Sequence, residues 1–141
     1  MPAKLKTIGT GAFMNNPNLT LSTLPDSLTS IGNLAFFGCP NLNINSFGEG
    51  NSKLETIGES AFSSSGENGL ITDIYIGESV DKVGLNAFMD YGNVKNIYFA
   101  KDYIEAYLYN DGINFHSNIS TMGFTKNNYD EIVWSWKGEI A

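Results

Sequence analysis

The dipeptide Ala-Phe occurs four times in this chain at nearly regular intervals, and it restricts the possible folds more than any other feature. It stands at residues 12–13, 35–36, 61–62 and 87–88, so the intervals are 23, 26 and 26 residues. Every copy ends the same nine-residue pattern, aliphatic-x-x-Ile/Val-Gly-x-x-Ala-Phe. A unit this short cannot bury its own apolar edge, so the copies must stack and share one core. The pattern therefore predicts a repeat solenoid.

A second motif follows each Ala-Phe copy and predicts a strand. Its four copies are LTLSTLP at 19–25, LNINSFG at 42–48, ITDIYIG at 71–77 and VKNIYFA at 94–100. Apolar and polar residues alternate at the end of each copy, as in a strand with one buried side. In the first two copies the inner aliphatic comes one residue early, at Leu21 and Ile44, where the pattern places Ser22 and Asn45. We therefore expect these two strands to be bulged or differently faced.

Two insertions explain the uneven intervals, so the underlying unit has 23 residues. Three extra residues lie near 49–52 and three more near 63–69, and both stretches are rich in Gly, Ser, Asn and Glu. Such compositions are typical of surface loops. The solenoid is therefore predicted to carry two extended loops without any change in its core.

Recurrent residue types also predict how the coils pack. The phenylalanines should stack as an aromatic spine, and each preceding alanine should occupy a sharp turn where a larger side chain would clash. The spine residues are Phe13, Phe36, Phe62 and Phe88. The glycine after each Ile or Val is expected where the strand bends, with a positive φ. These glycines are Gly9, Gly32, Gly58 and Gly84.

The combined motif resembles the BspA-type, or Treponema pallidum-type, leucine-rich repeats. The resemblance covers about residues 5–100 and is strongest over 28–42, where LTSIGNLAFFGCPNL follows the family pattern L-x-x-I-G-x-x-A-F-x-x-C-x-x-L. It implies a right-handed leucine-rich-repeat solenoid with short parallel β-strands and few helices, and a buried Cys39. Proteins of this family are mostly large bacterial surface proteins, implied in adhesion to host proteins or other cells.

The chain is predicted to form one compact unit with two parts. Residues 1–101 form the solenoid of four repeats, and residues 102–141 form a C-terminal α/β cap, with a short helix at 102–109 and strands at 113–119 and 131–137. An open solenoid needs such a cap over its last apolar coil. Trp134 and Trp136 share one side of the last strand, where they either fill the core of the cap or offer a platform for a ligand.

Charge and composition exclude several classes of partner. The net charge is −7, with a pI of about 4.5, and no cluster of Lys and Arg overrides it. Nucleic acid and anionic membrane surfaces require a positive footprint, so neither is expected as a partner. No apolar run is long enough for a membrane helix. Without a visible signal peptide, we expect a cell-surface or extracellular location if the chain is part of a larger exported protein, and a cytoplasmic or virion location otherwise.

The residues that carry most enzyme chemistry are scarce, so we expect no catalytic residues, metal or cofactor. His116 is the single histidine and Cys39 the single cysteine, and Cys39 stands at a position where the family has a buried cysteine. The carboxylates of Asp102, Glu105 and Asp111 are better explained by a solvated helix face than by a cation site. The glycines recur at repeat positions and form no phosphate loop.

Binding, if any, is predicted on the outward side of the second strand motif. Two ladders of equivalent positions run along it, and Tyr beside Asn and Thr is typical of adaptable binding surfaces. The first ladder is Thr23, Ser46, Tyr75 and Tyr98. The second is Thr20, Asn43, Thr72 and Lys95. Strand propensity and cross-strand stacking explain the same tyrosines without any ligand.

The first coil is the other candidate surface. Leu5, Ile8 and Phe13 begin the apolar ladders with no coil before them, and a bare solenoid end is an edge that seeks a partner. This edge predicts further repeats in the natural protein, a homo-oligomer, or docking into a larger assembly.

The leading interpretation is a non-enzymatic module that recognises a host or self protein and resembles bacterial surface adhesins. The alternative is a structural or accessory protein of a phage, a virion or another assembly.

Overall fold

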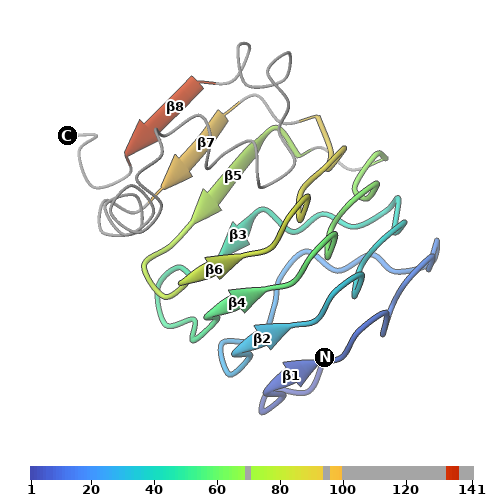
Figure 1. The fold of residues 1–141 in the computed structure, drawn as a ribbon, viewed down its shortest axis with the longest axis horizontal. Coiled ribbons are helices and arrows are strands. Elements are labelled where there is room, and N and C mark those ends of the chain that lie inside the picture. Colours follow the sequence, from blue (N-terminus) through green and yellow to red (C-terminus); the bar gives the residue numbers. More distant parts are fainter. Residues whose placement is uncertain (69–70, 94–95, 100–132, 137–141) are drawn as a thin grey trace.

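The computed structural model describes residues 1–68, 71–93, 96–99 and 133–136. They form successive coils stacked along one axis, from β1 at one end to β8 at the other (Figure 1). We number the coils 1 to 4, over residues 5–25, 28–48, 54–77 and 80–99. The described residues contain eight short strands and no helix. The predicted repeat solenoid with short parallel strands is confirmed.

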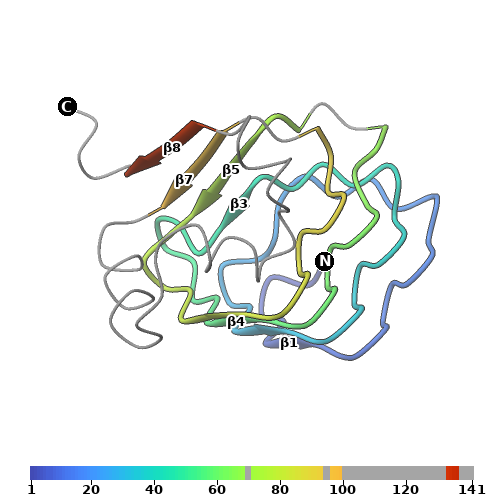
Figure 2. The ribbon, with the colours of Figure 1, turned by 45° about the horizontal axis from the view of Figure 1, so that its top comes forward.

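Two parallel four-stranded sheets run along two sides of the stack (Figure 2). Sheet A contains β1 (Thr7–Ile8), β2 (Ser30–Ile31), β4 (Thr56–Ile57) and β6 (Lys82–Val83) in that order. Sheet B contains β3 (Ser46–Phe47), β5 (Asp73–Ile76), β7 (Asn96–Phe99) and β8 (Val133–Trp136). Within coils 2 to 4, the Ile/Val-Gly motif supplies the strand of sheet A and the second motif supplies the strand of sheet B.

The phenylalanines form the predicted spine through the core. The rings of Phe13, Phe36, Phe62 and Phe88 stack in sequence, with centroids 5.3, 5.1 and 5.6 Å apart and interplanar angles of 8–11°. Phe47 and Tyr91 join this cluster edge-on, and sequence analysis did not assign either residue to it. The alanines that precede Phe36, Phe62 and Phe88 are fully buried, as the sharp turn requires.

The same three backbone hydrogen bonds link each pair of neighbouring coils beside the spine. From coil 1 to coil 2 they run from Gly11 N to Asn33 O, from Phe13 N to Ala35 O and from Asn15 N to Phe37 O, at 2.7–2.9 Å. Coils 2 and 3, and coils 3 and 4, repeat them at equivalent positions. The spacing of the coils is therefore set by backbone and aromatic contacts together.

The expectation of positive φ at the recurrent glycines is wrong. Positive φ instead occurs directly before each alanine, at Gly11, Leu34, Ser60 and Asn86, with values of 53–64°. The recurrent glycines are needed because neighbouring coils approach closely there. A Cβ on Gly32 would lie 2.7 Å from the backbone nitrogen of Thr10, and one on Gly84 would lie 2.5 Å from that of Glu59.

The N-terminal coil is covered better than its sequence predicts. Ile8 belongs to the core cluster and is only 4% exposed, while Leu5 and Phe13 are half-buried and pack against that cluster. A turn in which Leu5 N donates to Pro2 O precedes the coil. The side-chain apolar edge is therefore smaller than expected, because the first strand already turns Ile8 inward.

The predicted cap lies mostly outside the described residues. Its helix at 102–109 and its strand at 113–119 are not among them, whereas β8 falls within the predicted strand at 131–137. This strand pairs in parallel with β7, so it extends sheet B by one strand beyond coil 4.

Removing a central ring of the spine should be costly. We expect Phe62→Ala to lower the free energy of unfolding by about 3–5 kcal/mol, because large aromatic deletions in cores cost that much. Phe62 stacks on a ring on each side, whereas Phe13 stacks on one ring and is half-buried. Phe13→Ala is therefore the control, with about half the loss. Urea denaturation of both variants tests this, and equal losses would contradict the spine.

Two equivalent glycines should respond differently to the same substitution. Gly32→Ala should cost about 1–3 kcal/mol, because the added methyl group overpacks the contact with Thr10. Gly9→Ala should be nearly neutral in dilute solution, because its Cβ would meet no described atom within 4 Å and its φ is not positive. Melting temperatures of the two variants distinguish a steric need for glycine from a conformational one, which would affect both.

Candidate functional site

The outward side of sheet B brings most of the first predicted ladder into register. The strand pairing places Ser46 opposite Tyr75, Tyr75 opposite Tyr98 and Tyr98 opposite Ser135. Ser46 is exposed and its hydroxyl donates to Glu49 Oε1 at 2.9 Å, whereas Tyr75 is half-buried. Thr23 is exposed in coil 1, where residues 19–24 form no strand. An uninterrupted row of outward positions therefore crosses coils 2 to 4.

The second predicted ladder is only partly in register. Asn43 and Thr72 are both exposed, and Lys95 lies outside the described residues. Asn43 N donates to Leu21 O at 2.9 Å. By the pairing rule of parallel strands, this bond sets Asn43 beside Ser22 and not beside Thr20, with which its sequence aligns it. Coils 1 and 2 are therefore offset here by two residues from the sequence alignment.

Burial confirms the unusual facing predicted for the first two strand motifs. Ile44 and Phe47 are fully buried, while Asn45 and Ser46 between them are both exposed. Coil 1 repeats this arrangement, with Ser22 and Thr23 exposed between two partly buried leucines. Two consecutive outward residues break the alternation of a regular strand. The first two coils thus carry an extra outward residue near the end of the motif.

Coil 3 carries its extra outward residue at the other end of the motif. Thr72 and Asp73 lie between the buried Ile71 and Ile74, after which Tyr75 alternates normally with the buried Ile76. Coils 2 and 3 are therefore out of step over the first half of the motif. In agreement, β3 pairs with β5 over two residues, whereas β5 pairs with β7 over four.

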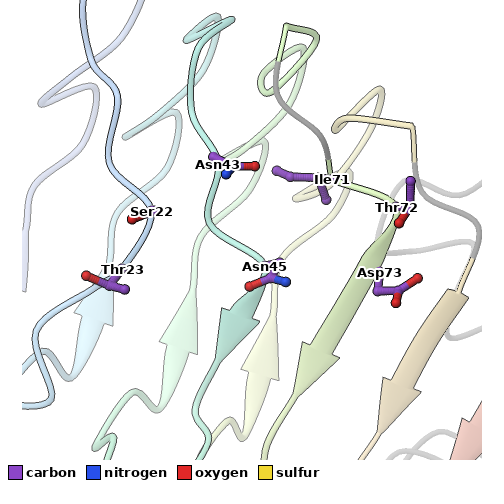
Figure 3. Close-up of a pocket in the computed structure, with 7 residues that line it drawn as sticks. All are labelled: Ser22, Thr23, Asn43, Asn45, Ile71, Thr72 and Asp73. Atoms are coloured by element: carbon purple, nitrogen blue, oxygen red, sulfur yellow. The ribbon is translucent and has the colours of Figure 1, made fainter.

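A surface hollow of about 360 Å³ lies where the coils are out of step (Figure 3). Thr23, Asn45 and Asp73 lie in a row across three successive coils in that view. The residues that line the hollow are Ser22, Thr23, Asn43, Asn45, Ile71, Thr72 and Asp73. Of this set, Thr23, Asn43 and Thr72 were predicted from the sequence as binding residues, whereas Ser22, Asn45, Ile71 and Asp73 were not. The one-residue shift at Leu21 and Ile44 is the sequence signal that could have located the hollow.

Comparison with protein-family models decides the family. The model for the BspA-type leucine-rich repeat region matches residues 6–129 in six copies, which is most of the chain. The chain belongs to the BspA-type leucine-rich repeat family. The match continues past residue 100, where the two motifs can no longer be followed in the sequence. No curated protein and no solved structure matches the chain.

Membership in the BspA-type family gives a general function. Leucine-rich repeats generally mediate protein–protein interaction and are generally not enzymes. The described residues of this BspA-type chain contain no group of three or more His, Cys, Asp or Glu side chains that could hold a metal ion. They also include no helix long and apolar enough to cross a membrane. His116 and the carboxylates of Asp102, Glu105 and Asp111 lie outside the described residues.

Cys39 of this BspA-type chain is buried, as the family pattern implies. Its side chain is inaccessible to solvent, and its thiol donates to Phe13 O at 3.0 Å. Burial raises the pKa of the Cys39 thiol, so the reactive thiolate is disfavoured. Cys39 is therefore a small core residue that links coil 2 to coil 1.

A buried tyrosine bonds to the backbone between two asparagines of the hollow. Tyr91 is 2% exposed, and its hydroxyl donates to Ile44 O, the carbonyl between Asn43 and Asn45. Burial raises the pKa of Tyr91 strongly, so its hydroxyl remains a hydrogen-bond donor. This hydrogen bond satisfies the Ile44 carbonyl oxygen. The carbonyl lies just before Asn45 and Ser46, the two consecutive outward residues of coil 2.

The pairing of β8 with β7 gives the register positions of the two tryptophans of this BspA-type chain. Trp134 pairs with Ile97 and Trp136 with Phe99, and these residues in turn pair with Ile74 and Ile76 of β5. Both isoleucines are buried. Trp134 and Trp136 therefore stand in register with these two core positions of β5.

Proposed function

We propose that the chain is a non-enzymatic recognition module that binds a protein partner through the outward side of sheet B. Within the family's general role in protein interaction, the finer proposal is adhesion. The partner is then a host protein or another copy of the chain, and the module belongs to a larger protein displayed at a bacterial cell surface.

The observation that carries this proposal is the register of Ser46, Tyr75 and Tyr98. Neighbouring strands are about 4.8 Å apart, so three equivalent outward positions form a row about 10 Å long. Tyrosine provides a large contact area at low cost in conformational entropy, and Ser, Thr and Asn beside it provide adaptable hydrogen bonds. The buried isoleucines on the other side of β5 hold the row rigid before a partner arrives.

Charge supports a protein partner over the other large classes. The chain carries a net charge of −7, which disfavours nucleic acids and anionic lipid surfaces by repulsion. A partner with a basic or neutral contact surface fits this charge best, and association should weaken as salt is raised if the partner is basic.

The double substitution Tyr75→Ser and Tyr98→Ser should weaken binding without unfolding the chain. Stability should fall only by about 1 kcal/mol, because cross-strand aromatic pairs are worth about that much. Binding should fall at least about tenfold, since interface tyrosines are frequent hot spots. The measurement is retention of the chain by a panel of immobilised extracellular-matrix proteins, alongside thermal melting.

Matched controls lie on the outward side of sheet A. Thr56 and Lys82 are paired residues of β4 and β6, and both point away from the core. The double substitution Thr56→Ser and Lys82→Ser should leave both binding and melting unchanged. If the tyrosine variant unfolds, or if both variants bind equally well, the tyrosines act in stability alone.

A second candidate function, assembly through coil 1, is favoured by a separate observation. In coil 2, the N–H groups of Thr29 and Gly32 donate to Lys6 O and Ile8 O. Their equivalents in coil 1, on Lys6 and Gly9, donate to none of the described residues, and β1 is an edge strand of sheet A. Gly9 also lacks the close contact that Gly32 makes. This backbone edge has the donors and the space to accept another strand.

Assembly through this edge predicts a concentration-dependent molar mass. Light scattering at tens of micromolar should give a dimer or larger species for the wild-type chain, and Gly9→Ala should shift it toward the monomer by obstructing close approach. Asn51→Ala is the control, because Asn51 is exposed in the loop between coils 2 and 3 and does not belong to the coil 1 edge. A wild-type chain that stays monomeric throughout would contradict assembly through coil 1.

A further inference from the structure

We infer that the hollow between coils 1 and 3 is a binding subsite for a neutral, hydroxyl-rich ligand, of which a sugar ring is the chemical type. This inference goes beyond protein recognition by the tyrosine row. It depends on the polar side chains around Asn43 and Asn45 and not on Tyr75 and Tyr98, and it stands whether or not a protein partner binds the tyrosines.

The polar side chains of the hollow have unused hydrogen-bonding capacity. Ser22, Thr23, Asn43, Asn45 and Thr72 are all exposed, and their side chains make no hydrogen bond to any described residue. Each hydroxyl and each amide side chain can both donate and accept. A sugar hydroxyl also does both, so such groups recognise it without a charge. The lining therefore matches the chemistry of a polyol.

Charge argues against the other small ligands. Among the residues that line the hollow, Asp73 is the only ionisable one and none is basic. A phosphate, sulfate or carboxylate ligand would find no counter-charge there, and the net charge of −7 would repel it. An apolar ligand would find little to contact, because small-molecule sites for such ligands are lined mainly by apolar and aromatic side chains.

Size and rigidity fit a small ring. The volume of about 360 Å³ lies at the lower end for small-molecule sites. Three successive coils span about 10 Å, comparable to one sugar ring with its substituents. Ile44 lies between Asn43 and Asn45 and is fully buried, Ile71 lines the hollow and is buried as well, and the Tyr91 hydroxyl donates to Ile44 O. The segment from Asn43 to Asn45 is thus held in place before a ligand enters.

The hollow also has a structural reason to be open. A regular parallel ladder would bring coil 2 and coil 3 together and pair their backbones. The extra outward residues of the two coils lie at opposite ends of the motif, so pairing between β3 and β5 begins only at Ser46. The exposed polar side chains that precede this point in coils 2 and 3 line the hollow.

Titration of the isotope-labelled chain with sugars, followed by NMR, tests the proposal. The probes are neutral mono- and disaccharides, namely glucose, galactose, mannose, N-acetylglucosamine and lactose, at up to about 50 mM, because a single small subsite gives millimolar affinity. The side-chain amide signals of Asn43 and Asn45 should shift saturably with at least one of them. Glucose 6-phosphate should not shift these signals.

Matched asparagine variants make the test specific. Asn45→Ala should weaken the sugar about tenfold, as loss of paired hydrogen bonds does. Asn51→Ala removes another exposed asparagine, which lies outside the hollow, and should change nothing. Both substitutions are on the surface, so thermal melting should match the wild type.

Three results would overturn the inference. The first is the absence of any saturable shift with every neutral sugar. The second is a shift that persists unchanged in Asn45→Ala. The third is a saturable shift of the same signals by an uncharged Asn- and Gln-containing peptide but by no sugar, which would assign the hollow to a polypeptide. None of these results depends on whether the tyrosine row binds a protein, so failure here is distinguishable from failure of the proposed function.

Discussion

Contact between successive coils is the constraint on which the rest of the structure depends. Four phenylalanine rings stack at 5.1–5.6 Å, and three backbone hydrogen bonds beside them recur between each pair of coils. Glycine after each Ile or Val permits this spacing, because a Cβ on Gly32 or Gly58 would collide with the backbone of the preceding coil. A coil with a larger residue at that position could not approach its neighbour closely enough to share the aromatic core.

The candidate sites arise where this regular stacking leaves freedom. The core demands an inward residue at fixed points of each coil, but the number of outward residues between those points can vary. In coil 2 the extra outward residue lies at Asn45–Ser46, and in coil 3 it lies at Thr72–Asp73. Their mismatch separates the two backbones and forms the polar hollow, while the regular pairing that follows forms the row of Ser46, Tyr75 and Tyr98.

A solenoid of this kind is suited to recognition because its outer surface carries little of its stability. The buried residues Ile44, Ile74 and Phe47 hold the backbone, whereas the side chains of exposed residues such as Asn43 and Thr72 make no hydrogen bond to another described residue. Exposed positions can therefore change without loss of the fold. The buried Cys39 and Tyr91, by contrast, belong to the fold. Both side chains pack in the core and donate a hydrogen bond to a backbone carbonyl.

The sequence by itself determined the repeat, the family, the aromatic spine and the alignment of Ser46 with Tyr75, because each depends on spacing along the chain. It also indicated unusual strands at Leu21 and Ile44. Only the tertiary structure decided that the recurrent glycines serve close approach, that Ile8 is covered, and that the shifted strands open a hollow beside β5. The physical reason is that the spacing of apolar residues along one coil indicates which residues face inward. Contact distances and surface hollows depend instead on how two neighbouring coils, each with its own irregular strand, pack against each other.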